Sequence, residues 1–260
     1  MLLKWKLYLE EINMAEVVND LLGYEGLKII QDTEKFNFSL DSTLLAEFVT
    51  INPQDKRILD IGTGNGFIPL FLSLKTKNLI DGIEIQKELC ESAKRSVKLN
   101  GLEEQITIIN NDVRGYHKII GVSKYDVITC NPPFFVYKDT SNINKNDYLT
   151  IARHEVTLSL EELLDSVRKL LKDNGTFTMV HRTERLMDIL EMFRKYGIEP
   201  KRIKFVYPKK NSSESLLVLI EGKKSTKKGG LKILKPLYVH NLDGTYTKEV
   251  LKIFNYQPTR

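Results

Sequence analysis

The sequence predicts an α/β fold in which a mostly parallel sheet carries helices on both faces. Short apolar runs of strand length alternate with amphipathic segments of helix length between residues 57 and 221. A glycine-rich turn joins the first apolar run to a helix-like segment. Acidic or amide side chains follow several of the runs, and the carboxyl ends of parallel strands meet at one edge of a sheet. We therefore expect a ligand site at that edge.

Seven strands are expected in this sheet, with helices between most of them. The strands are predicted at residues 57–61, 79–84, 105–109, 125–130, 176–181, 203–207 and 216–221. The helices are predicted at residues 67–72, 88–100, 160–171 and 184–196. A loop rather than a helix joins the last two strands, so one of them is expected to be antiparallel.

The chain is expected to form one domain in three parts. Its 260 residues are 42% hydrophobic and 28% charged, as in an ordinary soluble domain. Residues 1–50 are predicted to be a helical cap segment over the site. Residues 51–222 are predicted to be the core, and residues 223–260 a basic loop and tail packed on it.

Composition argues against several classes of protein. No run of about 18 apolar residues occurs and no segment is flanked like a signal peptide, so we expect a cytoplasmic protein with no membrane partner. Cys90 and Cys130 lack the spacing of metal ligands, so no metal is expected. The sequence does not indicate an oligomer, and a monomer is compatible with it.

The glycine-rich turn predicts a nucleotide or nucleoside cofactor. Gly62, Gly64 and Gly66 permit a positive φ and a close approach of the backbone to a ligand. A dinucleotide site needs a further glycine where this chain has Phe67, and Asp60 would repel a pyrophosphate. S-adenosylmethionine has no phosphate and carries a cationic sulfonium and amino group, so it suits this turn.

Two acidic residues at later strand ends extend the predicted cofactor site. Glu84 follows the second strand, where a carboxylate can accept hydrogen bonds from ribose hydroxyls. Asp112 follows the third strand and is expected to accept from the adenine amino group, with Val113 stacking beside the ring. A solvated strand end or loop remains the alternative interpretation for both acids.

Asn131-Pro132-Pro133-Phe134, after the fourth strand, predicts the chemistry. Both prolines fix φ and donate no N–H, so the turn is stiff and its carbonyls stay free to accept hydrogen bonds. The Asn131 side-chain oxygen and the Pro132 carbonyl can bind one NH2 group, while Phe134 offers a stacking face. These acceptors would localise the lone pair on a conjugated amine, which would then attack a methyl group. A tight proline turn is the alternative.

These motifs resemble a known family. Asp60-x-Gly62-x-Gly64-x-Gly66 with Asn131-Pro132-Pro133-Phe134 resembles class I S-adenosylmethionine-dependent methyltransferases acting on exocyclic or amide nitrogens. Three further segments resemble the bacterial enzymes that methylate N6 of adenine 37 in valine tRNA, over roughly residues 27 to 255. The three segments are residues 36–46, 152–155 and 180–186.

The resemblance implies roles for particular residues. It implies a Rossmann-like class I methyltransferase fold, with residues 51–222 as its core. Asn131 and Pro132 would hold the target amine, Phe134 would stack on the base where many relatives have tyrosine, and Asp41 and Arg153 would shape the pocket. The implied cofactor ligands are Gly62, Gly64, Gly66, Glu84 and Asp112.

A basic segment suggests a polyanionic partner. Residues 198–235 contain eleven Lys or Arg against three Glu, a net charge of +8, while the whole chain carries +5. Phosphate contacts of this type supply sequence-independent affinity for nucleic acid. We expect Lys223, Lys224, Lys227 and Lys228 to lie on a loop that closes on tRNA, although a solvated lysine-rich loop is the alternative.

Other functions satisfy part of the same pattern. A glutamine side-chain amide of a translation release factor, or adenine N6 in another RNA or in DNA, places the same demand on Asn131. An NAD-dependent oxidoreductase would need glycine in place of Phe67. A noncatalytic RNA-binding protein with a relict cofactor pocket is a further alternative.

Overall fold

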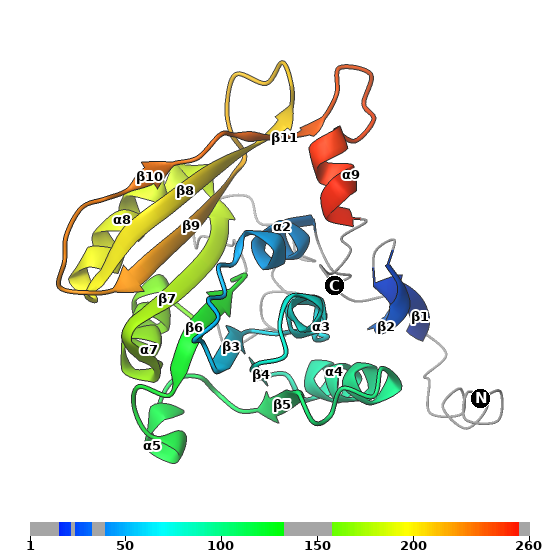
Figure 1. The fold of residues 1–260 in the computed structure, drawn as a ribbon, viewed down its shortest axis with the longest axis vertical. Coiled ribbons are helices and arrows are strands. Elements are labelled where there is room, and N and C mark those ends of the chain that lie inside the picture. Colours follow the sequence, from blue (N-terminus) through cyan, green and yellow to red (C-terminus); the bar gives the residue numbers. More distant parts are fainter. Residues whose placement is uncertain (1–15, 22–23, 33–39, 133–157, 255–260) are drawn as a thin grey trace, which may run out of the picture.

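The computed structural model describes residues 16–21, 24–32, 40–132 and 158–254 (Figure 1). A nine-stranded sheet runs through the centre, and a separate two-stranded sheet lies near the amino-terminal end. The predictions for Pro133, Phe134, Arg153 and residues 1–15 lie outside the described residues.

The main sheet has the order β10-β8-β9-β7-β6-β3-β4-β5, and β11 also pairs with β8. Only β9 runs antiparallel to its neighbours, so the prediction of one antiparallel strand in a mostly parallel sheet is confirmed. Two short strands, β10 and β11, extend the seven predicted ones. The strands are β3 (Arg57–Ile61), β4 (Leu79–Glu84), β5 (Ile106–Asn110), β6 (Tyr125–Cys130), β7 (Leu171–Arg182), β8 (Ile198–Lys209), β9 (Leu217–Lys224), β10 (Lys232–Ile233) and β11 (Leu237–His240).

Helices cover both faces of this sheet (Figure 1). One face carries α2 (Leu40–Phe48), α3 (Phe67–Lys75), α4 (Lys87–Leu99) and α9 (Lys248–Phe254). The other carries α5 (His117–Ile120), α7 (Leu160–Leu170) and α8 (Leu186–Lys195), the last preceded by the 3-10 turn η1 (Thr183–Arg185).

Alternation along the central strands builds two apolar cores. In β3, Ile58 packs in the cluster that contains Phe71 of α3, whereas the next residue, Leu59, packs in the cluster that contains Leu164 of α7. Both β3 side chains are completely buried. Successive strand side chains point to opposite faces, so a strand between two helical layers must be apolar at nearly every position.

The amino-terminal segment departs from prediction. Residues 1–50 were expected to be helical, but β1 (Glu16–Leu21) and β2 (Tyr24–Asp32) pair as antiparallel strands. The edge of β2 finds its polar partners on α4. Asn100 accepts from the Lys28 N–H (2.8 Å) and donates to its carbonyl (2.7 Å), and Ser96 Oγ accepts from the Ile30 N–H (3.0 Å). An extended backbone exposes these groups, whereas a helix would satisfy them internally.

Helix α2 is fixed at its carboxyl end by Lys75. The Lys75 Nζ donates to the carbonyl groups of Ala46 (2.9 Å), Glu47 (2.7 Å) and Val49 (2.9 Å). The last carbonyls of a helix have no partner within it, so this ammonium group supplies the missing donors. Burial lowers the pKa of Lys75 to about 8, against the opposing effect of Glu47.

Replacing Lys75 tests this anchor. Lys75→Met is expected to lower the free energy of unfolding by about 2 kcal/mol, because the three carbonyl groups lose their donor while the apolar volume is kept. Urea unfolding followed by circular dichroism measures the change. Lys94→Met is the control, because it removes an exposed ammonium group paired with Glu91, and it should change stability by less than about 0.5 kcal/mol. Equal losses in both variants would contradict a special role for Lys75.

Candidate active site

The glycine turn after β3 has the backbone that the sequence predicts. Gly62, Gly64 and Gly66 have φ values of 69°, 56° and 86°, in the region that side chains with a Cβ rarely adopt. A Cβ at Gly62 or Gly64 would meet open space, so at these positions the conformation alone requires glycine. A Cβ at Gly66 would also lie 3.2 Å from the Ala93 Cβ of α4. The turn therefore presents bare backbone beside the start of α3.

Glu84 lies beside this turn at the end of β4. Its Oε2 accepts from the Gly64 N–H at 2.8 Å and its Oε1 from the Gln86 N–H at 2.9 Å. The side chain is buried, with 5% of its surface exposed. Each carboxylate oxygen can accept two hydrogen bonds, so one position on each remains for the ribose hydroxyls expected there.

Asp60, in β3, is completely buried below the turn. Its Oδ1 accepts from the Thr129 hydroxyl of β6 at 2.7 Å, and no described residue donates to its Oδ2. Burial raises the pKa of Asp60 to about 7, the hydroxyl groups of Thr129 and Thr63 oppose this rise, and the nearby charge of Glu84 adds to it. A buried carboxylate below the turn attracts a cation above it through its charge, without direct contact.

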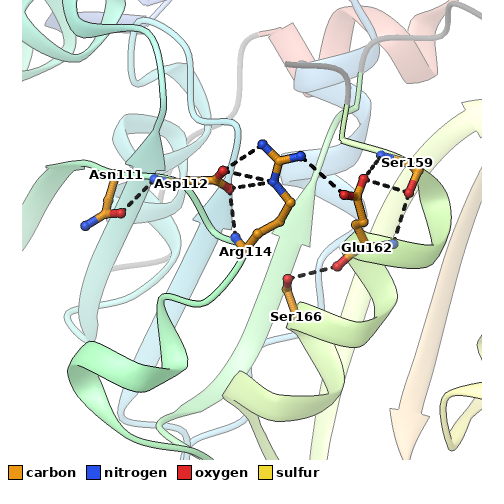
Figure 2. A network of polar contacts seen from close by, with 6 residues as sticks. All are labelled: Asn111, Asp112, Arg114, Ser159, Glu162 and Ser166. Carbon is orange, nitrogen blue, oxygen red and sulfur yellow. Dashed lines mark hydrogen bonds and ion pairs between the residues drawn. The ribbon is translucent and has the colours of Figure 1, made fainter.

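Asp112 is held by Arg114, a residue to which the sequence assigns no role. Figure 2 shows Arg114 beside its carboxylate. The Arg114 backbone N–H donates to Oδ1 (2.8 Å), its Nε to Oδ1 (3.1 Å) and Oδ2 (2.9 Å), and its Nη2 to Oδ2 (2.7 Å). These contacts use about all the acceptor positions of a carboxylate. An adenine amino group could bind Asp112 only after displacing part of Arg114, so this role stays a prediction.

The same arginine reaches α7. Its Nη1 donates to Glu162 Oε1 at 3.2 Å, and the other Glu162 oxygen accepts from the Ser159 N–H at 2.9 Å (Figure 2). The Ser159 hydroxyl accepts in turn from the Glu162 N–H, which completes a capping box. The end of β5 is thus linked to the start of α7 by charged groups. Val113, predicted to stack on adenine, is buried beside them.

Asn131 follows β6 directly and contacts helix α2. Its Nδ2 donates to Ser42 Oγ at 2.8 Å, and no described residue donates to its Oδ1. Both Asn131 and Pro132 are half-buried. No role for Ser42 could be predicted from the sequence, because no local pattern relates two positions 89 residues apart.

Asp41 also lies at this edge. Burial raises its pKa, while the positive charge of Arg182 at the end of β7 lowers it. Arg182 belongs to a segment quoted above for its resemblance. The structure therefore brings Asp41 to the same end of the sheet as Asn131, and its role in shaping the pocket stays a prediction.

The predicted basic loop lies at the other end. Because β9 is antiparallel, its first residue, Leu217, pairs with Arg182 at the carboxyl end of β7, whereas Lys223 pairs with Thr176 near the amino end. Lys224, Lys227 and Lys228 follow Lys223. These four lysines do not converge with Asn131, so any contact with tRNA would be remote from the target base.

The Lys224 ammonium group binds the carboxyl end of α7. Its Nζ donates to the carbonyl groups of Arg168 (2.9 Å) and Leu171 (2.7 Å) at the end of α7. A lysine at this position stabilises the helix terminus. Lys227 and Lys228 are exposed, and their role in RNA binding stays a prediction.

The residues at the carboxyl edge fit the cofactor predicted from the sequence. The turn leaves open space at Gly62 and Gly64, and the buried Asp60 carboxylate lies below it. Glu84 retains acceptor positions beside the turn. None of these groups offers the positive charge that a pyrophosphate would need, whereas carboxyl oxygens suit a sulfonium, an ammonium group or a ribose.

Comparison with known proteins decides the family. The model of the methyltransferase small domain matches residues 37–206. The chain belongs to the methyltransferase small domain family. The matched span includes α2, the glycine turn, Glu84, Asp112 and Asn131, and so covers the whole edge described above.

Several curated relatives share one name, tRNA1(Val) (adenine(37)-N6)-methyltransferase. The relative from Flavobacterium psychrophilum is 27% identical over 90% of this chain and 97% of its own length. That from Trichodesmium erythraeum is 29% identical over 88% and 94%, respectively. A relative from Bacteroides fragilis is 32% identical over 62% of this chain and 67% of its own.

Solved structures confirm the class I methyltransferase fold. A predicted O-methyltransferase from Agrobacterium tumefaciens has a TM-score of 0.64 at 18% identity and covers 85% of this chain and 100% of its own. The TYW2 protein of M. jannaschii, solved in complex with AdoMet, has a TM-score of 0.54 at 17% identity and covers 82% and 87%, respectively.

Among the described residues, neither a membrane-spanning helix nor a metal site is found. No helix among them is long and apolar enough to cross a membrane. No group of three or more His, Cys, Asp or Glu side chains among them is arranged to bind a metal ion. Cys90 and Cys130 are free and buried, and burial raises the pKa of the Cys130 thiol well above its usual value.

The titration of Asp60 predicts pH-dependent cofactor binding. With a pKa of about 7, Asp60 is mostly neutral at pH 6 and mostly ionised at pH 7.5. A cation binds the ionised form, so affinity for S-adenosylmethionine should rise about eightfold over this interval. Calorimetric titration measures it, and Asp60→Asn should remove most of the dependence. A wild-type affinity that is flat or falls with pH would contradict the assignment.

Proposed function

We propose that this chain is an S-adenosylmethionine-dependent methyltransferase that acts on N6 of adenine 37 in a valine tRNA. The observation that carries the proposal is the position of Asn131, at the same sheet edge as the glycine turn, in a chain that matches relatives of that name over nearly their whole length. Transfer RNA is the substrate, and the cytoplasm, where tRNA is modified, is the proposed location.

The methyl acceptor is bound by acceptor groups. An adenine amino group is a weak nucleophile because its lone pair is delocalised into the ring. Asn131 Oδ1 and the Pro132 carbonyl accept from its two N–H groups, which favours a tetrahedral nitrogen whose lone pair points at the methyl group. Asn131 thus contributes position and electrostatic stabilisation, and water takes the proton that the amine loses.

The acidic residues hold the cofactor. S-adenosylmethionine supplies an electrophilic methyl group when it is bound. Asp60 faces its cationic part from below the glycine turn, and Glu84 accepts from the ribose hydroxyls with the positions that Gly64 and Gln86 leave free. Asp112 accepts from the adenine amino group when Arg114 shifts toward Glu162, and Val113 lies beside the ring.

The tRNA must present an unstacked base. Enzymes that act on base atoms extrude the nucleotide into a pocket, at a cost of a few kcal/mol that is lowest for unpaired bases. Phosphate contacts supply the general affinity. Lys209 and Lys210 lie where β8 ends, on the same side of the sheet as Asn131, and are better placed than residues 223–228 to meet phosphates near the target.

The proposal is tested by mass spectrometry of nucleosides. The protein is incubated with S-adenosylmethionine and tRNA from a strain that lacks this gene, and the tRNA is then digested. New N6-methyladenosine in valine tRNA is the expected result. Methylation of a translation release factor in a parallel reaction, with unmodified tRNA, would replace the tRNA assignment by a protein-glutamine one. No product in either reaction would contradict the proposal.

Asn131→Ala is expected to reduce turnover strongly. Losing one positioned hydrogen-bond acceptor costs about 2 to 4 kcal/mol of transition-state stabilisation. Single-turnover rates with radiolabelled cofactor measure the loss, while calorimetry should show near-normal cofactor affinity. Asn78→Ala, at the amino end of β4 on the opposite edge, is the matched control and should keep the wild-type rate. Near-normal turnover by Asn131→Ala would refute its role.

A further inference from the structure

A hydrogen bond joins Asn131, after β6, to Ser42 in helix α2. Asn131 Nδ2 donates to Ser42 Oγ at 2.8 Å, across 89 positions of sequence. Asn131 stands at the end of β6, and Ser42 lies in the first turn of α2. The function proposed above uses the oxygen of the Asn131 amide. The contact with Ser42 uses its nitrogen, so the two ends of one planar group have separate partners.

We propose that Ser42 is a positioning residue for methyl transfer, which holds the Asn131 amide so that Oδ1 faces the amine of the substrate. The inference rests on the proposed function, because that function gives Oδ1 its task. Ser42 itself touches neither the amine nor the cofactor in this role. It acts through Asn131.

The chemistry of an amide makes this orientation matter. Rotating the group by half a turn exchanges its oxygen with an NH2 group of almost the same shape. The rotated amide would present donors to a substrate that also offers donors, and it would not bind the amine. An acceptor at the place where Nδ2 must lie therefore favours the productive orientation.

The serine hydroxyl can serve as that acceptor. A hydroxyl has two lone pairs and one hydrogen. When a hydroxyl gives its hydrogen to one partner, its lone pairs remain for an NH2 group. Ser42 takes part in a further interaction besides the one with Asn131.

Both partners stand on rigid supports. In α2, Thr43, Leu44 and Leu45 are at most 1% exposed, and the Lys75 ammonium group fixes the far end of the helix. Before Asn131, Cys130 is 2% exposed and pairs with Ile61 and Met179 in the neighbouring strands. A positioning contact between two fixed elements keeps its geometry through the reaction.

A purely structural bond would behave differently. Ser42 and Asn131 are both only half-buried, so a hydrogen bond between them adds little to stability. If Ser42 merely stabilised α2, its removal would have the same effect whether or not Asn131 is present. If it orients Asn131, its removal matters only when the Asn131 amide is there to be oriented.

A double-mutant cycle separates these cases. Single-turnover methylation of tRNA is measured for wild type, Ser42→Ala, Asn131→Ala and the double variant, with cofactor affinity measured alongside. Ser42→Ala should lower the rate roughly 10- to 30-fold in the wild-type background, with unchanged cofactor affinity, and less than about twofold beside Asn131→Ala. Ser42→Thr keeps the hydroxyl and should retain most of the rate. Ser73→Ala removes a buried hydroxyl that bonds Leu70 and should leave the rate unchanged.

Equal losses from Ser42→Ala in both backgrounds, or no loss in either, would overturn the proposal. A second readout does not depend on turnover. In protein labelled with 15N-asparagine, the side-chain NH2 signals of Asn131, identified by their loss in Asn131→Ala, should move in Ser42→Ala and stay near their wild-type shifts in Ser42→Thr. Unmoved signals in Ser42→Ala would overturn the positioning role. Inactive wild-type protein with the expected signal changes would refute the proposed function while the Ser42 contact stands.

Discussion

The parallel register of β3 with its two neighbours is the constraint on which the site depends. Ile61 pairs with Ile83 of β4 on one side and with Cys130 of β6 on the other. The residues that follow these three positions, Gly62, Glu84 and Asn131, therefore lie at the same edge of the sheet. A slip of one residue would turn every side chain of β3 to the other face and would separate the glycine turn from Asn131.

Negative charge is concentrated at this level, and the fold compensates it unequally. The Glu84 carboxylate accepts from two backbone N–H groups, whereas the Asp60 carboxylate is stabilised by the hydroxyl groups of Thr129 and Thr63. The pKa of Asp60 rises to about 7 because of burial, with Glu84 adding to the effect. The protein therefore keeps a buried carboxylate close to where a positively charged methyl donor would bind. This carboxylate favours a cation over the anionic dinucleotides that similar turns bind.

The sequence predicted those features of the fold that depend on residues close together in the chain. Apolar runs located all seven core strands, and the loop between the last two correctly indicated the reversed β9. The β1–β2 sheet was missed because the partners of its edge, Ser96 and Asn100, lie on a helix more than sixty positions away. The position of Lys223 follows from strand direction rather than composition, and the occupation of Asp112 by Arg114 depends on side-chain conformation. Neither can be derived from residue types at fixed spacing.

The carboxyl-terminal strands also affect how this molecule meets other molecules. β8 is twelve residues long, and between Pro200 and Pro208 it would otherwise leave a row of backbone donors and acceptors at the margin of the sheet. β10 and β11 cover it in two short pieces, separated by a stretch that contains Pro236, which has no N–H to offer. Interrupted margins with proline resist the addition of strands from another chain. The tail therefore shields this margin of the sheet from edge-to-edge aggregation.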